Sequence, residues 1–163
     1  MTPDENDGRA MKSLQLKVPP PLVVFTSAAL MAGLAYAFPG AAIDLPARWV
    51  LALVLAAIGF VCIAAGIIEF RRHETTIDPR QPQRSSSLVD TGIYRFTRNP
   101  MYLGFLVVLT GWAVYLGNLL PFIVLPMYVL YLGKYQIGPE ERHLAAKFGD
   151  RYDAYRGKVR RWL

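Results

Sequence analysis

Two short polar segments of this 163-residue chain carry side chains that can do chemistry together. The first combines aromatic, guanidinium and amide groups, in Tyr94, Arg95, Arg98, Asn99 and Tyr102. The second combines carboxylates with basic groups, in Glu140, Glu141, Arg142 and His143. Arginine binds carboxylates through paired hydrogen bonds, glutamate binds ammonium groups or ribose hydroxyls, and tyrosine rings pack against purines or sulfonium cations. These residue types together suit a zwitterionic ligand that carries all of those groups.

The same side chains also fit structural roles. Arginines mark the ends of membrane spans, tyrosines gather at the membrane interface, and Glu140 and Glu141 complement the dipole of a helix that begins at Pro139. Spacing alone leaves both interpretations open. A metal site is not expected, because His73 and His143 are the only histidines and lack a helical His-Glu spacing. The sequence also has no glycine-rich phosphate loop and no serine nucleophile motif.

Long apolar stretches must position the two polar segments. A membrane-spanning helix needs roughly 20 apolar residues, and the uncharged stretches 18–38 and 49–68 each supply one. The third stretch, 101–133, would be about 50 Å long as one helix, against a hydrocarbon core of about 30 Å. The turn residues Gly117-Asn118 divide it, which predicts an antiparallel hairpin. The predicted spans are therefore 18–38, 48–68, 101–117 and 119–137.

The hairpin brings the two polar segments to the same face of the membrane, where they are expected to face one cavity. Gly138-Pro139 predicts the end of the fourth span and the start of an amphipathic helix over 139–160. Its apolar side chains recur at spacings of three and four residues, at Leu144, Phe148, Tyr152, Tyr155 and Val159. We expect this helix to lie on the cytoplasmic membrane surface or against the bundle.

The sequence thus predicts an all-α membrane protein with four short transmembrane helices, the last two a helical hairpin, plus a C-terminal amphipathic cytoplasmic helix. Residues 1–17 are expected to be a flexible tail, and 18–163 a single transmembrane domain. Of the 18 lysines and arginines, only Arg48 falls in the two connections expected to face away from the cytoplasm. This asymmetry predicts cytoplasmic N and C termini in a bacterial inner membrane. We therefore expect the net charge of +6 to favour contact with membrane lipids, and we do not expect nucleic acid as a partner.

Two blocks in the C-terminal half resemble the isoprenylcysteine carboxyl methyltransferase family and its phospholipid methyltransferase relatives. They are LVDTGIYRFTRNPMYLG, residues 88–104, and EERHLAAKFGDRYDAYRGKVRRW, residues 140–162. The resemblance implies methyl transfer from S-adenosylmethionine, bound at the cytoplasmic face, to a lipophilic acceptor that enters from the lipid. That acceptor would be a prenylcysteine-like carboxylate or a lipid.

The resemblance, taken with the polar segments, also implies the site residues. The expected catalytic residues are Arg98, Tyr102, Glu141 and Arg161. The expected cofactor-binding residues are Tyr94, Arg98, Asn99, Pro100, Tyr102, Gly104, Glu140, Glu141, Tyr152 and Tyr155. Asn99 stands where eukaryotic members of the family have histidine, which removes any acid-base role at that position.

The implied mechanism is in-line displacement at the sulfonium methyl, which mainly requires alignment of the reacting atoms. A carboxylate acceptor needs no base, whereas an amine would need Glu141 or Tyr102 to remove a proton. Two other functions stay open. One is an NADPH-dependent membrane sterol or enone reductase, whose similar block usually has asparagine where this chain has Met101. The other is a small non-enzymatic membrane adaptor, which would bind no cofactor.

Overall fold

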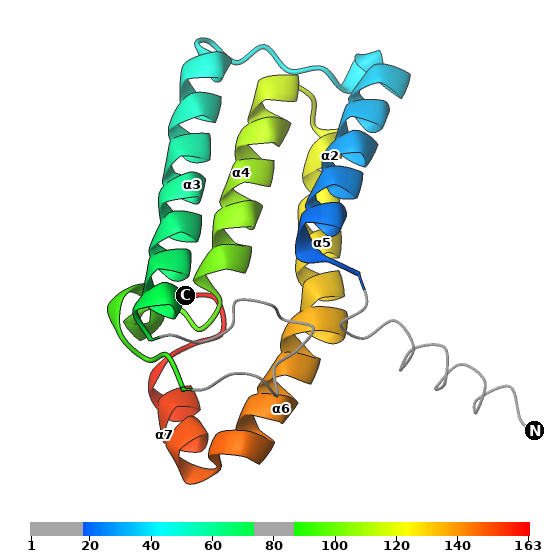
Figure 1. Ribbon diagram of the computed structural model, residues 1–163. Coiled ribbons are helices and arrows are strands. Elements are labelled where there is room, and N and C mark those ends of the chain that lie inside the picture. Colours follow the sequence, from blue (N-terminus) through cyan, green and yellow to red (C-terminus); the bar gives the residue numbers. More distant parts are fainter. Residues whose placement is uncertain (1–17, 74–86) are drawn as a thin grey trace, which may run out of the picture.

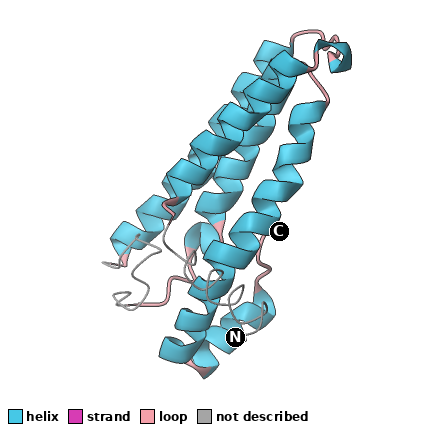
Figure 2. Ribbon diagram, turned by 90° about the vertical axis from the view of Figure 1, so that its right-hand side faces the viewer, coloured by secondary structure: helices cyan, strands magenta, loops and turns pink. Residues whose placement is uncertain are grey.

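A computed structural model describes residues 18–73 and 87–163, so the predicted tail over 1–17 lies outside the described residues. The regular elements within those ranges are helices, and Figure 2 shows them joined by loops without a strand. Four helical segments run side by side along the long axis of the molecule (Figure 1), namely α2 (Pro20–Ala37), α3 (Arg48–Arg72), α4 (Pro100–Leu116) and a continuous run through α5 (Val124–Leu132) and α6 (Gly138–Phe148). The predicted all-α membrane fold is confirmed.

Three of these segments are long and apolar enough to cross a membrane, and α4 is an apolar helix of 17 residues. The fourth segment, 120–148, is helical over 29 residues, which corresponds to about 43 Å. Because a hydrocarbon core is only about 30 Å thick, the C-terminal part of this segment extends beyond it. The predicted span 119–137 covers the apolar part of this segment, where Lys134 is the only charged residue.

Glycines allow α3 and α4 to pack with their backbones nearly in contact. A Cβ atom added to Gly59 would lie 2.6 Å from the carbonyl oxygen of Gly104, and the converse distance is also 2.6 Å. Small residues at such contacts are the usual basis of helix association in membranes, because dispersion contacts replace the hydrophobic effect there. On its other side α4 contacts α2, where the indole Nε1 of Trp112 donates to the Ala28 carbonyl at 3.1 Å.

The fourth segment differs from the prediction that Gly138-Pro139 ends a helix. A short 3₁₀ turn, η4 (Leu120–Ile123), leads into α5, and a π-helical turn, η5 (Gly133–Ile137), leads directly into α6. A proline inside an α-helix lacks a donor, and its ring crowds the carbonyl four residues earlier. The widened turn ends on a bond from the Gly138 N–H to the Gly133 carbonyl, immediately before Pro139. The π turn thus lets the helix continue through the proline.

The single amphipathic helix predicted over 139–160 is instead two helices. Gly149 has φ 51° and ψ −131°, a conformation open essentially only to glycine, and it separates α6 from α7 (Asp150–Lys158). The bend leaves the predicted apolar face intact in space. Its side chains form one cluster with Leu88, namely Leu144, Phe148, Tyr152, Tyr155 and Val159.

At the far end of the bundle the two connections are hydrogen bonded to each other. The predicted turn at Gly117-Asn118 is present, with Gly117 in the left-handed conformation at φ 60°. The Ile43 N–H donates to the Gly117 carbonyl at 2.8 Å, and the Leu119 N–H donates to the Ala41 carbonyl at 3.0 Å. The side-chain amide of Asn118 donates to the Phe38 carbonyl at 2.9 Å. This end of the molecule, drawn at the top of Figure 1, is therefore tied together.

Candidate functional site

The candidate site lies at the opposite end, where the start of α4, the start of α6 and the last residues of the chain meet (Figure 1). Its centre is an ion pair between Arg98 Nη2 and Glu141 Oε1 at 3.1 Å. The two side chains are only 11% and 14% exposed, so solvent screens the pair weakly. The hairpin of the third and fourth segments brings these residues together, as the sequence had suggested.

Glu141 also binds a second guanidinium group. Arg161 donates from Nε to Oε1 at 3.1 Å and from Nη2 to Oε2 at 2.5 Å, which is a paired, fork-like contact. This hydrogen bond to Glu141 is the main cause that raises the pKa of Arg161. Three residues predicted to be catalytic therefore form one charged cluster, and Glu141 is its shared anion.

Arg98 has unused hydrogen-bonding capacity. Its Nε and Nη1 atoms are buried and have no hydrogen-bond partner. Buried donors are nearly always paired in folded proteins, because an unpaired one keeps the cost of losing water. These unpaired N–H groups are therefore complementary to an acceptor such as a carboxylate oxygen.

The second carboxylate of the pair, Glu140, has a different environment. The Tyr102 hydroxyl donates to Glu140 Oε1 at 2.6 Å. Glu140 lies three residues beyond the spanning part of its helix. Burial raises the pKa of its carboxyl to about 8. The Tyr102 hydrogen bond lowers this pKa, and the charge of nearby Glu141 raises it. Adjacent glutamates thus differ, since both oxygens of Glu141 bind arginines whereas Glu140 accepts a hydrogen bond from one hydroxyl.

The C-terminal residues brace the segment before α4. Asn99 donates from Nδ2 to the Arg161 carbonyl at 2.9 Å, and the Thr97 hydroxyl donates to the same oxygen at 3.2 Å. The backbone N–H of Arg98 donates to the backbone carbonyl of Arg160 at 3.0 Å. The side-chain amide of Asn99 thus holds Arg161 in place, and the expected place of Asn99 at the cofactor stays a prediction. Thr97 was missed, and its only sequence signal is its position two residues before Asn99.

Pro100 and Gly104 contribute to the start and the packing of α4. Pro100 is buried at the first position of α4, where a missing N–H costs nothing. Gly104 faces α3, in the close contact with Gly59, and does not contribute to the charged cluster. Gly104 therefore serves helix packing in this structure, and its expected place at the cofactor stays a prediction.

Three of the four tyrosines of the predicted site, Tyr94, Tyr152 and Tyr155, form a buried aromatic wall. The Tyr155 hydroxyl donates to the Tyr94 carbonyl at 2.8 Å, which joins α7 to the turn η3 (Gly92–Arg95). Burial raises the pKa of Tyr152 to about 12, and it also raises the pKa values of Tyr94 and Tyr155. All three hydroxyls therefore stay protonated at neutral pH and serve as hydrogen-bond donors or packing groups.

A buried carboxylate on α3, Glu69, was not singled out from the sequence. It accepts a hydrogen bond from the Thr91 hydroxyl at 2.7 Å and pairs with Arg72 at 3.1 Å. Gly92, with φ 55°, lies against it so closely that an added Cβ would be 2.5 Å from the carboxyl carbon. Glu69 thus anchors the segment that leads to Arg98. An acidic residue ending an apolar span would have been the signal.

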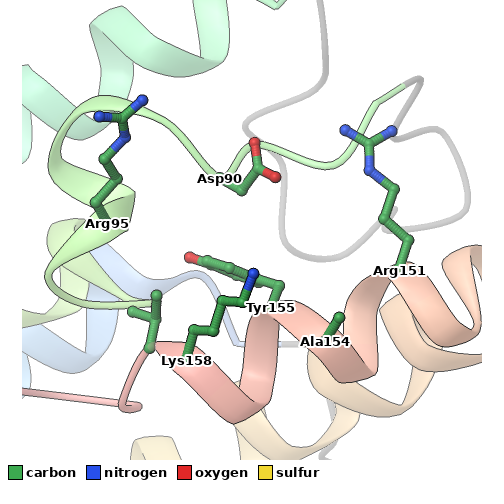
Figure 3. A pocket seen from close by; sticks show the side chains of 7 residues that line it. Asp90, Arg95, Arg151, Ala154, Tyr155 and Lys158 are labelled. Carbon is green, nitrogen blue, oxygen red and sulfur yellow. The ribbon is translucent and has the colours of Figure 1, made fainter.

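A surface cavity of about 490 Å³ lies on the outer side of this segment (Figure 3). Its lining combines cations, one carboxylate and small apolar groups, from Asp90, Arg95, Arg151, Ala154, Tyr155, Lys158 and Val159. Tyr155 is the one lining residue that it shares with the predicted cofactor site. Arg95, expected on the surface, is exposed here.

Comparisons with known proteins agree with this geometry. The family model described as phospholipid methyltransferase matches residues 47–151. A Haemophilus influenzae protein described as uncharacterized is 44% identical over 63 residues, which are 39% of this chain and all of that protein. The Schizosaccharomyces pombe protein-S-isoprenylcysteine O-methyltransferase is 29% identical over 108 residues, 63% of this chain and 46% of that enzyme. The chain thus covers about half of the yeast relative.

No solved structure matches the chain significantly. The family match nevertheless extends over more than half of the chain and includes Arg98, Tyr102 and Glu141. It starts just before α3 and ends at the second residue of α7, so it contains the helices that bring these side chains together. This membrane protein is a member of the phospholipid methyltransferase family.

Proposed function

We propose that this chain transfers the methyl group of S-adenosylmethionine to a lipophilic acceptor at the cytoplasmic face of the bacterial inner membrane. The observation that carries the proposal is the pair of buried, unpaired donors of Arg98, beside two adjacent glutamates of different character. A ligand with one carboxylate and nearby cationic groups satisfies both features. The residues present therefore fit this cofactor.

The chain's own residues take distinct roles in this proposal. Arg98 binds an oxygen of the methionyl carboxylate through one of its unpaired donors, Nε or Nη1, while its bond to Glu141, which Arg161 also holds, fixes the guanidinium group. Glu140 takes the ammonium group, and its bond to Tyr102 orients the carboxyl. Tyr94, Tyr152 and Tyr155, with Asn99 and Pro100 behind them, form the wall of the site. When bound, S-adenosylmethionine supplies an electrophilic methyl group.

The acceptor follows from the relatives and from the membrane setting. The yeast relative is named for a prenylated cysteine, and the family description names phospholipids. A prenylcysteine-like carboxylate would need no base. An amine would have to lose a proton before transfer, and in this proposal both glutamates are already engaged, Glu140 by the cofactor ammonium and Glu141 by two arginines.

The test is a titration of the detergent-purified full chain with S-adenosylmethionine, S-adenosylhomocysteine and NADPH. We expect saturable binding of the first two and none of NADPH. Binding of NADPH without S-adenosylmethionine would replace the proposal with a membrane reductase. Binding of none of the three by folded protein would favour a non-enzymatic adaptor.

A further inference from the structure

A row of inward-facing side chains leads from the candidate site into the membrane-spanning part of the bundle. Its members are four residues apart on one continuous helical segment, at Tyr128, Leu132, Gln136 and Glu140. On an α-helix, each step of four residues turns the side chain by about 40° more than a full turn around the helix axis. The wider π turn at 133–137 takes up part of that drift, and Tyr128, Leu132 and Gln136 are all at most 2% exposed.

Two polar atoms in this row have no partner. The Tyr128 hydroxyl and the Gln136 Oε1 atom are both buried without a hydrogen bond. The orientation of the Gln136 amide is settled by its other end, since Nε2 lies 2.6 Å from the Val18 carbonyl, which can only accept. The free atom of Gln136 is therefore an acceptor, and the free group of Tyr128 is a hydroxyl.

Unpaired polar groups inside a membrane-spanning bundle are costly, because no water is available to satisfy them. Such groups mark ligand pathways more often than packing. Here they occur on the same face as Glu140, and Tyr128 shares a buried cluster with Tyr102, which is bonded to Glu140. The row therefore connects the proposed methyl-transfer site with the apolar interior.

We propose that Tyr128 and Gln136 form the subsite that holds the polar group of the methyl acceptor, with its apolar chain in the bundle interior; this rests on the proposed function. The Gln136 oxygen requires a hydrogen-bond donor on the acceptor, and the Tyr128 hydroxyl contributes a second hydrogen bond. The subsite thus selects an amphiphile whose polar group carries an N–H or O–H, such as an amine or hydroxyl. An ionised carboxylate has no hydrogen to offer Gln136.

The test uses dodecanol as a probe, because it combines one hydroxyl with a single apolar chain. Its matched control is dodecyl methyl ether, which accepts hydrogen bonds but cannot donate one. The full chain in lipid nanodiscs, saturated with S-adenosylhomocysteine, is titrated with each probe while the midpoint of thermal unfolding is followed. We expect dodecanol to stabilise the wild-type protein at lower concentration than the ether, with a difference of about three- to ten-fold.

The decisive variant is Tyr128→Phe, which deletes an unpaired hydroxyl. Without probe, its unfolding midpoint should equal or exceed that of wild type, because a buried unpaired group is removed. Its affinity for S-adenosylhomocysteine should stay within about two-fold, while the preference for dodecanol over the ether falls about three-fold or more. Tyr131→Phe, on the same helix but only partly buried, should keep the full preference.

Equal responses to dodecanol and ether in wild type, or an unchanged preference in Tyr128→Phe, would overturn the subsite. Failure of S-adenosylhomocysteine to bind in its own titration would instead remove the proposed function. The two failures are thus read from separate measurements.

Discussion

Glu141 is the anion on which the candidate site depends, because it pairs with Arg98 and Arg161 at once. We expect Arg98→Ala to lose the proposed carboxylate contact, and Glu141→Ala to leave Arg98 misoriented. Each contact is charge-assisted and poorly exposed, so cofactor binding should weaken about ten-fold or more in either variant. Isothermal titration of S-adenosylmethionine against the purified variants measures the change.

Matched controls come from the same two segments. Arg95→Ala and His143→Ala remove exposed side chains that lie outside the charged cluster, so binding should change less than about three-fold. If folded Arg98→Ala and Glu141→Ala proteins keep wild-type affinity, these residues only anchor the bundle at the membrane boundary.

The raised pKa of Glu140 predicts how cofactor affinity depends on pH. The ligand-free site holds a proton on this carboxyl up to about pH 8, whereas a bound ammonium group favours the ionised form. Binding therefore releases a proton and strengthens as the pH rises, by about ten-fold per pH unit well below pH 8. Titrations at pH 6 and 7 measure the slope.

The matched variant for this dependence is Glu140→Gln, which should bind weakly and with a flat profile between pH 6 and 7. If the affinity of the wild-type protein did not change with pH, the prediction would be wrong. An equal change in Glu140→Gln would show that another group titrates.

The sequence was informative about which residues meet, and less so about what each one contacts. Arg98 and Glu141 were predicted to line one cavity because charge types and a hairpin are visible in the sequence, and in the structure they pair directly. The bonds of Asn99 and Thr97 to the Arg161 carbonyl depend on where the chain returns after α7, and no local pattern encodes that path. The same holds for Glu69, whose partner Thr91 lies 22 positions further along the chain.

At the scale of elements, the spans were predictable because apolar length is a strong signal. The bend between α6 and α7 was not predictable, because apolar residues recur every three or four positions on both sides of Gly149, as they would along one continuous helix. A glycine within such a pattern fits either a helix interior or a break. Only the three-dimensional structure distinguishes the two cases, because the buried cluster around Leu88 forms when α6 and α7 fold toward one another.

Gly149→Ala is therefore expected to destabilise the protein. The φ and ψ values at this position are strongly unfavourable for any residue with a Cβ, at a cost of about 1 to 3 kcal/mol. The midpoint of thermal unfolding should fall by several degrees, measured in detergent.

Gly157→Ala is the matched control, because this glycine lies inside α7 with open space around it. It should be neutral or slightly stabilising. Equal midpoints for Gly149→Ala and wild type would mean that the two helices can merge.

For the whole molecule, the distribution of basic residues predicts that both termini are cytoplasmic. Fusion of alkaline phosphatase, which is active only outside the cytoplasm, after Leu163 should give an inactive reporter. Fusion after Asn118, in the connection at the other end, should give an active one. The reverse result would invert the orientation.

The hydrogen bonds that join the two connections at that other end have a mechanical consequence. Hydrogen bonds from Ile43, Asn118 and Leu119 join the end of α2, and the connection that follows it, to the end of α4. A relative tilt of these helices about that joined end would displace their opposite ends, by about 4 Å for a tilt of about 10° over a 17-residue helix. At that opposite end the start of α4 is held by the Arg98–Glu141 ion pair and the Tyr102–Glu140 hydrogen bond. Opening of the bundle toward the membrane there therefore requires these two contacts to break, whereas the hydrogen bonds at the joined end can stay.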